Sequence, residues 1–145
     1  MILGVGTDLV NIRRIERALD RFGERFLTRL FTEEERRAAG LKEMNAAAIY
    51  AKRFAVKEAC AKALGTGLTC GIIWRNFEIM TGPLGQPLLH LTGKAARKLI
   101  DITPIGMVAQ IDVTVSDEYP FAQAFVVISA MPREKERYQA DRRVN

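Results

Sequence analysis

The sequence predicts an α+β domain in which a mostly antiparallel sheet packs against one long helix. Residues 45–64 are rich in alanine and lysine and contain no glycine or proline, which is typical of a long helix. Residues 107–116 and 121–130 are β-favouring segments with a turn between them, and they predict an antiparallel hairpin. Residues 2–10 are apolar and favour a strand that opens the sheet. These segments account for the predicted core.

The remaining segments predict shorter elements. Apolar residues at spacings of three and four predict one helix from Ile12 to Phe26. Thr32 and Glu35 have the spacing of a capping box, so a short helix should start there and end near Gly40. The part between the long helix and the hairpin predicts strands at 72–74 with 77–80 and at 88–91, a turn at 82–85, and a helix over 93–100.

The length of 145 residues fits a single domain. We expect this domain to span residues 1–131, and we expect the charged residues 132–145 to form a tail outside its core. The formal net charge of +5 favours acidic partners, such as phosphate-rich ligands or acidic proteins. Charge alone does not choose among these partners.

The apolar pattern also bears on location. No stretch approaches the roughly 20 apolar residues of a membrane span, so we expect no membrane association. The N-terminal segment carries Asp8 and has no basic region, so we expect no signal peptide and a cytoplasmic protein. Cys60 and Cys70 have neither a metal-binding spacing nor a partner cluster, and we interpret them as reduced thiols.

Three residues are candidates for chemistry, each with a simpler alternative. Glu58 and Lys62 are four residues apart on the long helix, where a plain surface ion pair is the simplest interpretation. Asp8 follows the apolar strand and is either a helix N-cap or a ligand at a strand end. Arg53 lies about 140° around the helix from Glu58, so helical spacing alone does not join them. Gly65 could approach an anion or simply end the helix.

The first predicted helix carries a basic ridge. Its arginines recur at spacings of three and four, and acidic residues are interleaved with them. The ridge is either a solvated, self-paired surface or a docking site for an acidic protein helix. Its arginines are Arg14, Arg17, Arg21 and Arg25.

Two segments resemble the signatures of the holo-acyl-carrier-protein synthase family, the short bacterial 4'-phosphopantetheinyl transferases. They are GVGTDLVNIRRIE at residues 4–16 and RFAVKEACAKALGTG at residues 53–67. The resemblance extends over the order of elements from residue 1 to about 130. It implies a 4'-phosphopantetheinyl transferase-like fold and transfer of 4'-phosphopantetheine from coenzyme A to a serine of apo acyl carrier protein, which supports fatty acid biosynthesis. It also implies a homotrimer with sites between subunits.

The resemblance further implies a catalytic centre. In this family the carboxylates at the positions of Asp8 and Glu58 bind Mg2+, a cation that prefers oxygen ligands and bridges to substrate phosphates. Lys62 matches the family lysine near the pyrophosphate of coenzyme A, which makes it the third catalytic residue. The proton of the carrier serine would pass to Asp8 or to a metal-bound water, with Lys57 as a weaker alternative.

The resemblance assigns binding residues as well. Arg53, Lys62 and Gly65 match positions that contact coenzyme A, and Arg14 and Arg21 match positions that contact the acidic helix of the carrier protein. Ser116 stands at the end of the penultimate strand, where the family often has a Ser-His pair that reaches coenzyme A across a subunit boundary. Here Asp117 replaces that histidine, and a carboxylate would repel a phosphate unless a metal or an arginine intervened.

Two alternatives stay open at this stage. A non-catalytic protein of the same fold could bind a carrier without modifying it, although the presence of Asp8, Glu58 and Lys62 favours catalysis. The same reaction could also serve the carrier domain of a polyketide or peptide synthase. We expect no nucleic acid partner, because few aromatic residues lie among the basic ones.

Overall fold

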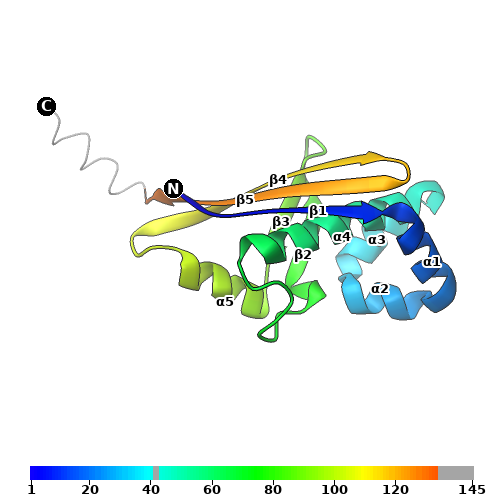
Figure 1. Ribbon diagram of the computed structural model, residues 1–145, viewed down its shortest axis with the longest axis horizontal. Coiled ribbons are helices and arrows are strands. Elements are labelled where there is room, and N and C mark those ends of the chain that lie inside the picture. Colours follow the sequence, from blue (N-terminus) through cyan, green and yellow to red (C-terminus); the bar gives the residue numbers. More distant parts are fainter. Residues whose placement is uncertain (41–42, 134–145) are drawn as a thin grey trace, which may run out of the picture.

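The computed structural model describes residues 1–40 and 43–133, and it confirms the predicted α+β class. An antiparallel sheet has the strand order β1 (Ile2–Asn11), β5 (Phe121–Pro132) and β4 (Met107–Glu118), and a separate hairpin joins β2 (Phe77–Thr81) to β3 (Pro87–Leu91). The helices are α1 (Ile12–Phe22), α2 (Glu24–Leu30), α3 (Glu33–Gly40), α4 (Ala46–Ala63) and α5 (Gly93–Ile102), with short 3-10 turns η1 (Glu43–Asn45) and η2 (Trp74–Asn76). The helices lie on one side of the larger sheet (Figure 1).

The long helix α4 lies directly against β1 because two glycines let the backbones meet. A Cβ atom on Gly6 would stand 1.8 Å from the carbonyl oxygen of Ala59, and one on Gly4 would stand 1.9 Å from that of Ala63. No side chain fits at either position. The two glycines of the first motif therefore set the distance between the first strand and the long helix.

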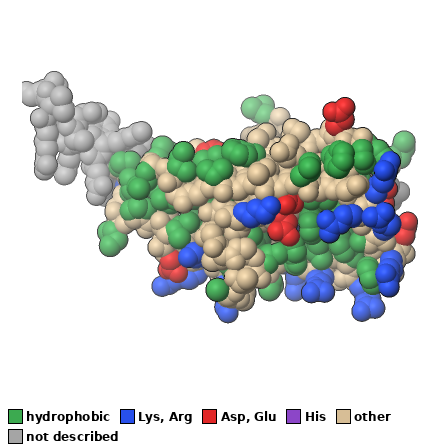
Figure 2. All heavy atoms as spheres, viewed as in Figure 1, with side chains coloured by type: hydrophobic (Ala, Val, Ile, Leu, Met, Phe, Trp, Pro, Cys, Tyr) green, Lys and Arg blue, Asp and Glu red, His purple; other side chains and the backbone are tan. Residues whose placement is uncertain are grey.

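The larger sheet has one buried and one exposed face. Alternate residues of β5 pack toward α4 and are fully or almost fully buried, as a strand's period of two requires. The opposite face carries apolar side chains that none of the described residues covers, and they gather along the strands in Figure 2. We call this surface the outer apolar face; its large members are Val5, Leu9, Val108, Phe121, Phe125 and Met131.

Two predictions about the helices and strands were wrong. The helix predicted from Ile12 to Phe26 is divided at Gly23, whose φ of 51° lies in the left-handed region that favours glycine. The strand predicted from residue 72 begins only at Phe77, because Trp74–Asn76 form a 3-10 turn. The capping box is confirmed: Thr32 N donates to Glu35 Oε1 over 3.0 Å, and Glu35 N donates to Thr32 Oγ1 over 3.3 Å.

The described residues reach just past residue 131, where the sequence predicts the end of the domain. Strand β5 extends to Pro132, and Arg133 N donates to the carbonyl oxygen of Gly106 over 3.2 Å. The rest of the predicted tail lies outside the described residues. Among the helices that the structure describes, none combines the length and the apolar character needed to cross a membrane.

Candidate active site

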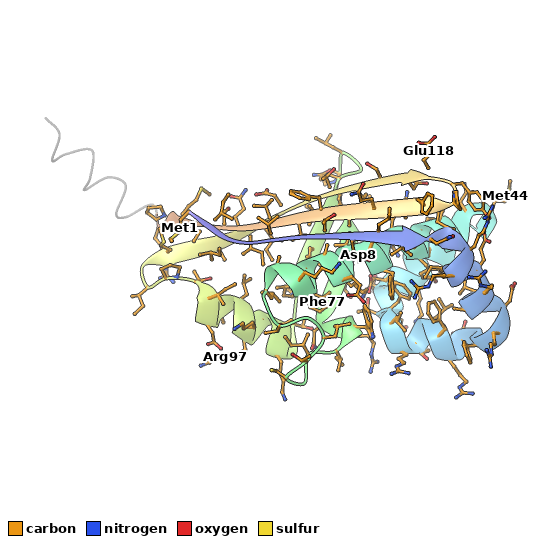
Figure 3. The ribbon with its side chains drawn as sticks, in the orientation of Figure 1. Met1, Asp8, Met44, Phe77, Arg97 and Glu118 are labelled. Atoms are coloured by element: carbon orange, nitrogen blue, oxygen red, sulfur yellow. The ribbon has the colours of Figure 1, made fainter. Side chains whose placement is uncertain are left out.

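Asp8 lies on the buried face of β1, toward α4 (Figure 3). Its carboxylate accepts a hydrogen bond from Lys62 of α4, with 2.9 Å between Nζ and Oδ1. The same ammonium donates to the carbonyl oxygen of Thr7 over 2.8 Å. The N-cap of α1 is Asn11, whose side chain accepts from Arg13 N. The N-cap alternative for Asp8 was therefore wrong, and its carboxylate is free to face the helix.

Glu58 brings a second carboxylate to the same place. It is half-buried, and this burial raises the pKa of its carboxyl above the ordinary value. The neighbouring Asp8 carboxylate raises the pKa of Glu58 further, while Lys62 and Arg14 act in the opposite direction. Since Lys62 forms its ion pair with Asp8, the plain surface pair of Glu58 with Lys62 is not what the structure shows.

The two carboxylates fit a hard divalent cation. Carboxylate oxygens are the ligands that Mg2+ prefers, and Mg2+ uses few protein ligands because it keeps water and substrate oxygens. A cation between Asp8 and Glu58 would remove the like-charge interaction that raises the pKa of Glu58. Within residues 1–40 and 43–133, no larger group of three or more His, Cys, Asp or Glu side chains could hold a metal.

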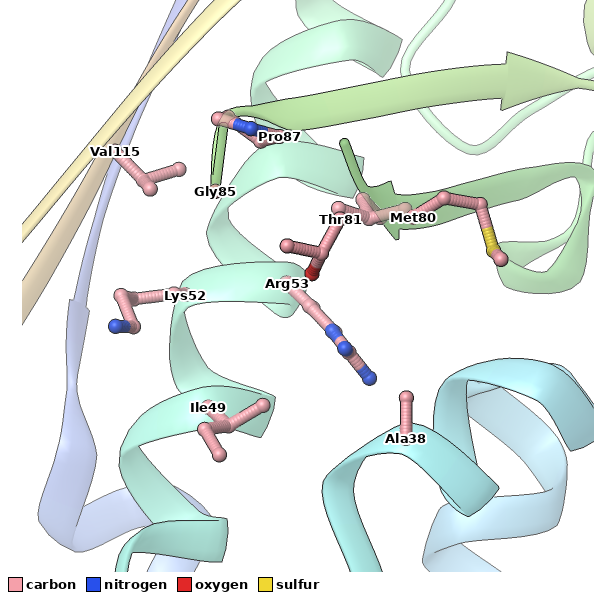
Figure 4. Close-up of a pocket in the computed structure, with 10 residues that line it drawn as sticks. Ala38, Ile49, Lys52, Arg53, Met80, Thr81, Gly85, Pro87 and Val115 are labelled. Atoms are coloured by element: carbon pink, nitrogen blue, oxygen red, sulfur yellow. The ribbon is translucent and has the colours of Figure 1, made fainter. Parts of the chain in front are cut away.

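A pocket of about 450 Å³ opens on the same side of the sheet as this pair, between α3, α4, the hairpin of β2 and β3, and β4 (Figure 4). Val115 lines it and is paired with Ala124, which is paired in turn with Asp8. Val115 and Asp8 therefore lie on the same face of the sheet, and two strand spacings put their backbones about 10 Å apart. Arg53 also lines it, and its Nη1 donates to the carbonyl oxygen of Glu35 over 2.5 Å. The site thus combines two carboxylates with a basic cavity.

Asp117 contributes no free negative charge at this cavity. Its carboxylate lies 3.3 Å from the ammonium of Lys52, another residue of the pocket lining. In Figure 4, Lys52 extends toward the strands and Arg53 toward Ala38 of α3. A lysine, rather than the metal or arginine considered from the sequence, therefore neutralises Asp117.

Ser116 and Gly65 lie at the edges of the site. Ser116 is exposed and paired with Gln123 on the outer apolar face, so it lies on the side of the sheet away from Asp8. Ser116 therefore cannot reach Asp8 within one protomer. Gly65 has a φ of 78°, and its N–H donates to the carbonyl oxygen of Lys62 over 2.9 Å. This left-handed residue ends α4, as the sequence predicted.

The basic ridge is shorter than the sequence suggested. Arg14, Arg17 and Arg21 are exposed on α1, whereas Arg25 belongs to α2 because the helix is broken at Gly23. Figure 2 shows basic side chains gathered at the end of the molecule that carries these helices. Arg21 also lies 5.1 Å above the ring of Phe22, which is half exposed.

Sequence reasoning missed a buried ion pair behind the site. Lys57 Nζ lies 2.6 Å from Glu35 Oε1, and it also donates to the carbonyl oxygens of Phe77 and Trp74. All three protons of the ammonium are used, so the alternative of Lys57 as the proton acceptor is wrong. The signal was the position of Lys57 inside the alanine-rich run that predicts the buried face of the helix.

A comparison with models of known protein families shows to which family this chain belongs. The model of the 4'-phosphopantetheinyl transferase superfamily matches residues 4–124. The chain belongs to this superfamily. It is therefore a phosphopantetheinyl transferase, and the predicted family and enzyme class are confirmed.

Its relatives carry one activity in their names. The chain is 54% identical over 135 residues to the holo-[acyl-carrier-protein] synthase of Rhodopseudomonas palustris, covering 91% of this chain and 97% of that one. It is 55% identical over 134 residues to the synthase of Dinoroseobacter shibae, covering 92% and 96%. The matches thus cover nearly the whole length of these two relatives.

Solved structures of the same transferases share the fold. The Neisseria meningitidis holo-[acyl-carrier-protein] synthase superposes with a TM-score of 0.76 at 37% identity, over 89% of this chain and 99% of that one. The Bacillus anthracis synthase, in complex with coenzyme A (3',5'-ADP), has a TM-score of 0.71 at 32% identity, over 88% and 96%. The Helicobacter pylori synthase, in complex with coenzyme A, has a TM-score of 0.72 at 30% identity, over 86% and 99%.

Proposed function

We propose that this transferase moves 4'-phosphopantetheine from coenzyme A to a serine of apo acyl carrier protein, which supports fatty acid biosynthesis. The observation that carries the proposal is the meeting of Asp8, Glu58 and Lys62 beside a basic pocket. The names of the relatives support it, because each is a holo-[acyl-carrier-protein] synthase. Two structural neighbours bind coenzyme A or its 3',5'-ADP part.

Asp8 and Glu58 would hold Mg2+ at this site. The bound cation supplies charge stabilisation to the phosphate oxygens of coenzyme A. Lys62, which is exposed and anchored on Asp8, stands where it can donate to the same oxygens. Its fixed position costs no rearrangement when charge develops during transfer.

The chemistry is an in-line displacement at phosphorus. The oxygen of the carrier serine forms a bond to the β-phosphorus of coenzyme A, the bond from that phosphorus to the bridging oxygen breaks, and 3',5'-ADP leaves. The serine proton goes to the carboxylate of Asp8, a residue within β1 whose side chain is 17% exposed to solvent. The main contribution of the protein is to place the two reactants and offset their charge.

The nucleotide half of coenzyme A fits the pocket lined by Lys52 and Arg53. Arg53 offers a guanidinium that is nine-tenths buried, where a charge-assisted hydrogen bond to phosphate is strong. Gly65 lies two residues after the end of α4. Because it has no Cβ atom, its backbone can approach the nucleotide closely. The exposed arginines Arg14 and Arg21 would dock the acidic helix of the carrier.

A homotrimer would complete the site. Large apolar side chains of the outer apolar face remain exposed in a single chain, among them Leu9 at 62% and Phe125 at 43%. Contiguous exposed apolar surface is typical of a protein interface. Because Ser116 lies on that face, a neighbouring subunit could present its Ser116 to coenzyme A, as the sequence resemblance implies. A cytoplasmic location belongs to the same proposal.

The decisive experiment is transfer with purified components. The protein is incubated with coenzyme A, Mg2+ and apo acyl carrier protein, and the mass of the carrier is measured. A gain of one phosphopantetheine is expected for the wild type and is expected to be lost in Asp8→Ala and Glu58→Ala. Binding of the carrier without mass gain would instead support the non-catalytic alternative. Repeating the assay on several apo carriers would separate the fatty acid carrier from polyketide and peptide synthase carriers.

A further inference from the structure

The buried ion pair between α3 and α4 is completely satisfied. Glu35 and Lys57 both have side chains that are 0% exposed, and one ammonium joins Glu35, Phe77 and Trp74. Oε1 of Glu35 also accepts from Thr32 N, and Oε2 accepts from Ile79 N over 3.4 Å. The pair therefore connects α3, α4, η2 and β2 through groups that point in fixed directions.

Such a pair is a poor source of stability by itself. Two buried charges lose their hydration, and an apolar pair of the same size is often as stable or more so. Burial lowers the pKa of Lys57, and the neighbouring Glu35 carboxylate opposes this effect. The pair instead constrains geometry: each of its hydrogen bonds forms only at a particular position and rotation of α4 relative to α3 and β2.

The position of the pair links it to the candidate metal site. Lys57 directly precedes Glu58, and neighbouring residues of a helix diverge by about 100°. Lys57 points toward α3 and β2, whereas Glu58 shares a helix face with Lys62, whose ammonium contacts Asp8 of β1. Helix α4 is thus held from two sides, by Gly4 and Gly6 of β1 on one and by the Lys57 hydrogen bonds on the other.

We propose that Glu35 and Lys57 are positioning residues that set the rotation of α4 and thereby direct the Glu58 carboxylate at Asp8. Neither residue touches substrate. The inference rests on the proposed Mg2+ site, and it concerns how Glu58 is kept aligned with Asp8.

Two variants test this role against a matched control. Lys57→Met keeps the length of the side chain and removes its charge, and Glu35→Gln keeps shape and hydrogen-bonding capacity. Ile128→Val is the control, because it removes a methyl group from a fully buried core residue and leaves the pair intact. The melting temperature, coenzyme A binding by calorimetry with Mg2+ or with EDTA, and kcat and KM for coenzyme A are measured for each, at a temperature where each protein is folded.

The proposal predicts that Lys57→Met and Glu35→Gln each lose at least about tenfold in kcat and in the Mg2+-dependent part of coenzyme A affinity, because a small misplacement of a site residue has effects of this size. The control is expected to lower the melting temperature and leave both quantities unchanged. If Lys57→Met and Glu35→Gln behave like Ile128→Val, the proposal is overturned. If Lys57→Met does not fold, Glu35→Gln alone provides the test. If Mg2+ does not change the affinity of the wild type for coenzyme A, the proposed metal site is wrong. In that case kcat of Lys57→Met and Glu35→Gln alone tests the positioning role.

Discussion

The ammonium of Lys62 lies 2.9 Å from Oδ1 of Asp8, across the contact between the long helix and the first strand. Helical spacing would have paired this lysine with Glu58, its neighbour one turn away. The ammonium contacts the strand carboxylate instead, through Oδ1 of Asp8. Oδ2 of Asp8 and the carboxylate of Glu58 thus remain as possible ligands of a cation.

Lys62→Met is expected to affect catalysis far more than stability. The lysine side chain is 52% exposed, so loss of its ion pair should change the free energy of unfolding by less than about 1 kcal/mol. The transfer rate should fall by about a hundredfold, as for loss of one fixed charge-stabilising donor. Arg97→Met, which breaks an exposed pair with Asp101, is the control and should change neither. A normal rate in Lys62→Met would contradict the assignment.

Glu58→Gln should stabilise the metal-free protein at neutral pH. Burial and Asp8 raise the pKa of Glu58 in the folded state, so its ionisation opposes folding when the pH exceeds this raised value. The gain should be at most about 1 kcal/mol because the group is partly hydrated. The gain should decrease as the pH falls through the raised pKa and should vanish below the ordinary value of 4.5, where the carboxyl is protonated in both the folded and the unfolded state. Urea unfolding in EDTA across pH checks this; a gain that grows at low pH would refute it.

As the pH is lowered, the affinity for Mg2+ should begin to fall at a higher pH than it would if Glu58 had the ordinary pKa of a glutamate. The cation binds the ionised carboxyl, and the raised pKa of Glu58 means that protons compete at higher pH than the usual 4.5. Calorimetric titration of Mg2+ in the presence of coenzyme A at several pH values measures this shift. Glu58→Gln is the control, since its Mg2+ binding should be weak throughout. A wild-type affinity that stays constant down to the ordinary glutamate value would exclude Glu58 as a ligand.

Gly6→Ala should prevent normal folding. The added methyl group would stand 1.8 Å from the carbonyl oxygen of Ala59, and neither backbone can move without displacing α4 from β1. We expect a loss of about 3 kcal/mol or more of unfolding free energy. Gly40→Ala is the matched control: nothing lies within 4 Å of its Cβ position, and α3 should gain up to about 1 kcal/mol. Equal melting temperatures of the two variants would contradict the close packing.

Phe125→Glu should disrupt the proposed trimer. Phe125 is 43% exposed in the middle of the outer apolar face, and a carboxylate buried there without a partner would be costly. Light scattering is expected to give three times the chain mass for the wild type and the chain mass for the variant. Ile100→Glu on α5 is the control, because its exposed side chain lies away from this face and should leave the mass unchanged. A monomeric wild type would remove the trimer from the proposal.

Asp117→Asn should tighten coenzyme A binding. The substitution breaks the ion pair and frees the ammonium of Lys52 at the pocket, where it can attract a phosphate. KM for coenzyme A is expected to fall by about threefold, and less at high salt, because the two side chains are partly exposed. Asp101→Asn, in the exposed pair with Arg97, should leave KM unchanged. A rise in KM for Asp117→Asn would show that the carboxylate takes part in binding.

The elements that the sequence predicted well are those specified by neighbouring residues. The long helix, the final hairpin and the capping box of Thr32 and Glu35 depend on composition, alternation or spacing within a short segment. The division of the first helix at Gly23 was missed because the apolar spacing continues across the break. The 3-10 turn at Trp74–Asn76 was missed because the β-favouring residues Ile72, Ile73 and Trp74 lead into it.

The family and the enzyme class follow from two long motifs in the sequence, which also contain Asp8, Glu58 and Lys62. Three contacts became known only from the folded chain: Lys62 pairs with Asp8, Lys52 neutralises Asp117, and Lys57 is buried against Glu35. These contacts join residues 22 to 65 positions apart, and their geometry depends on how closely α4 packs on β1. Periodicity assigns a residue to a face of its own helix or strand, whereas the partner opposite that face is set by packing between elements.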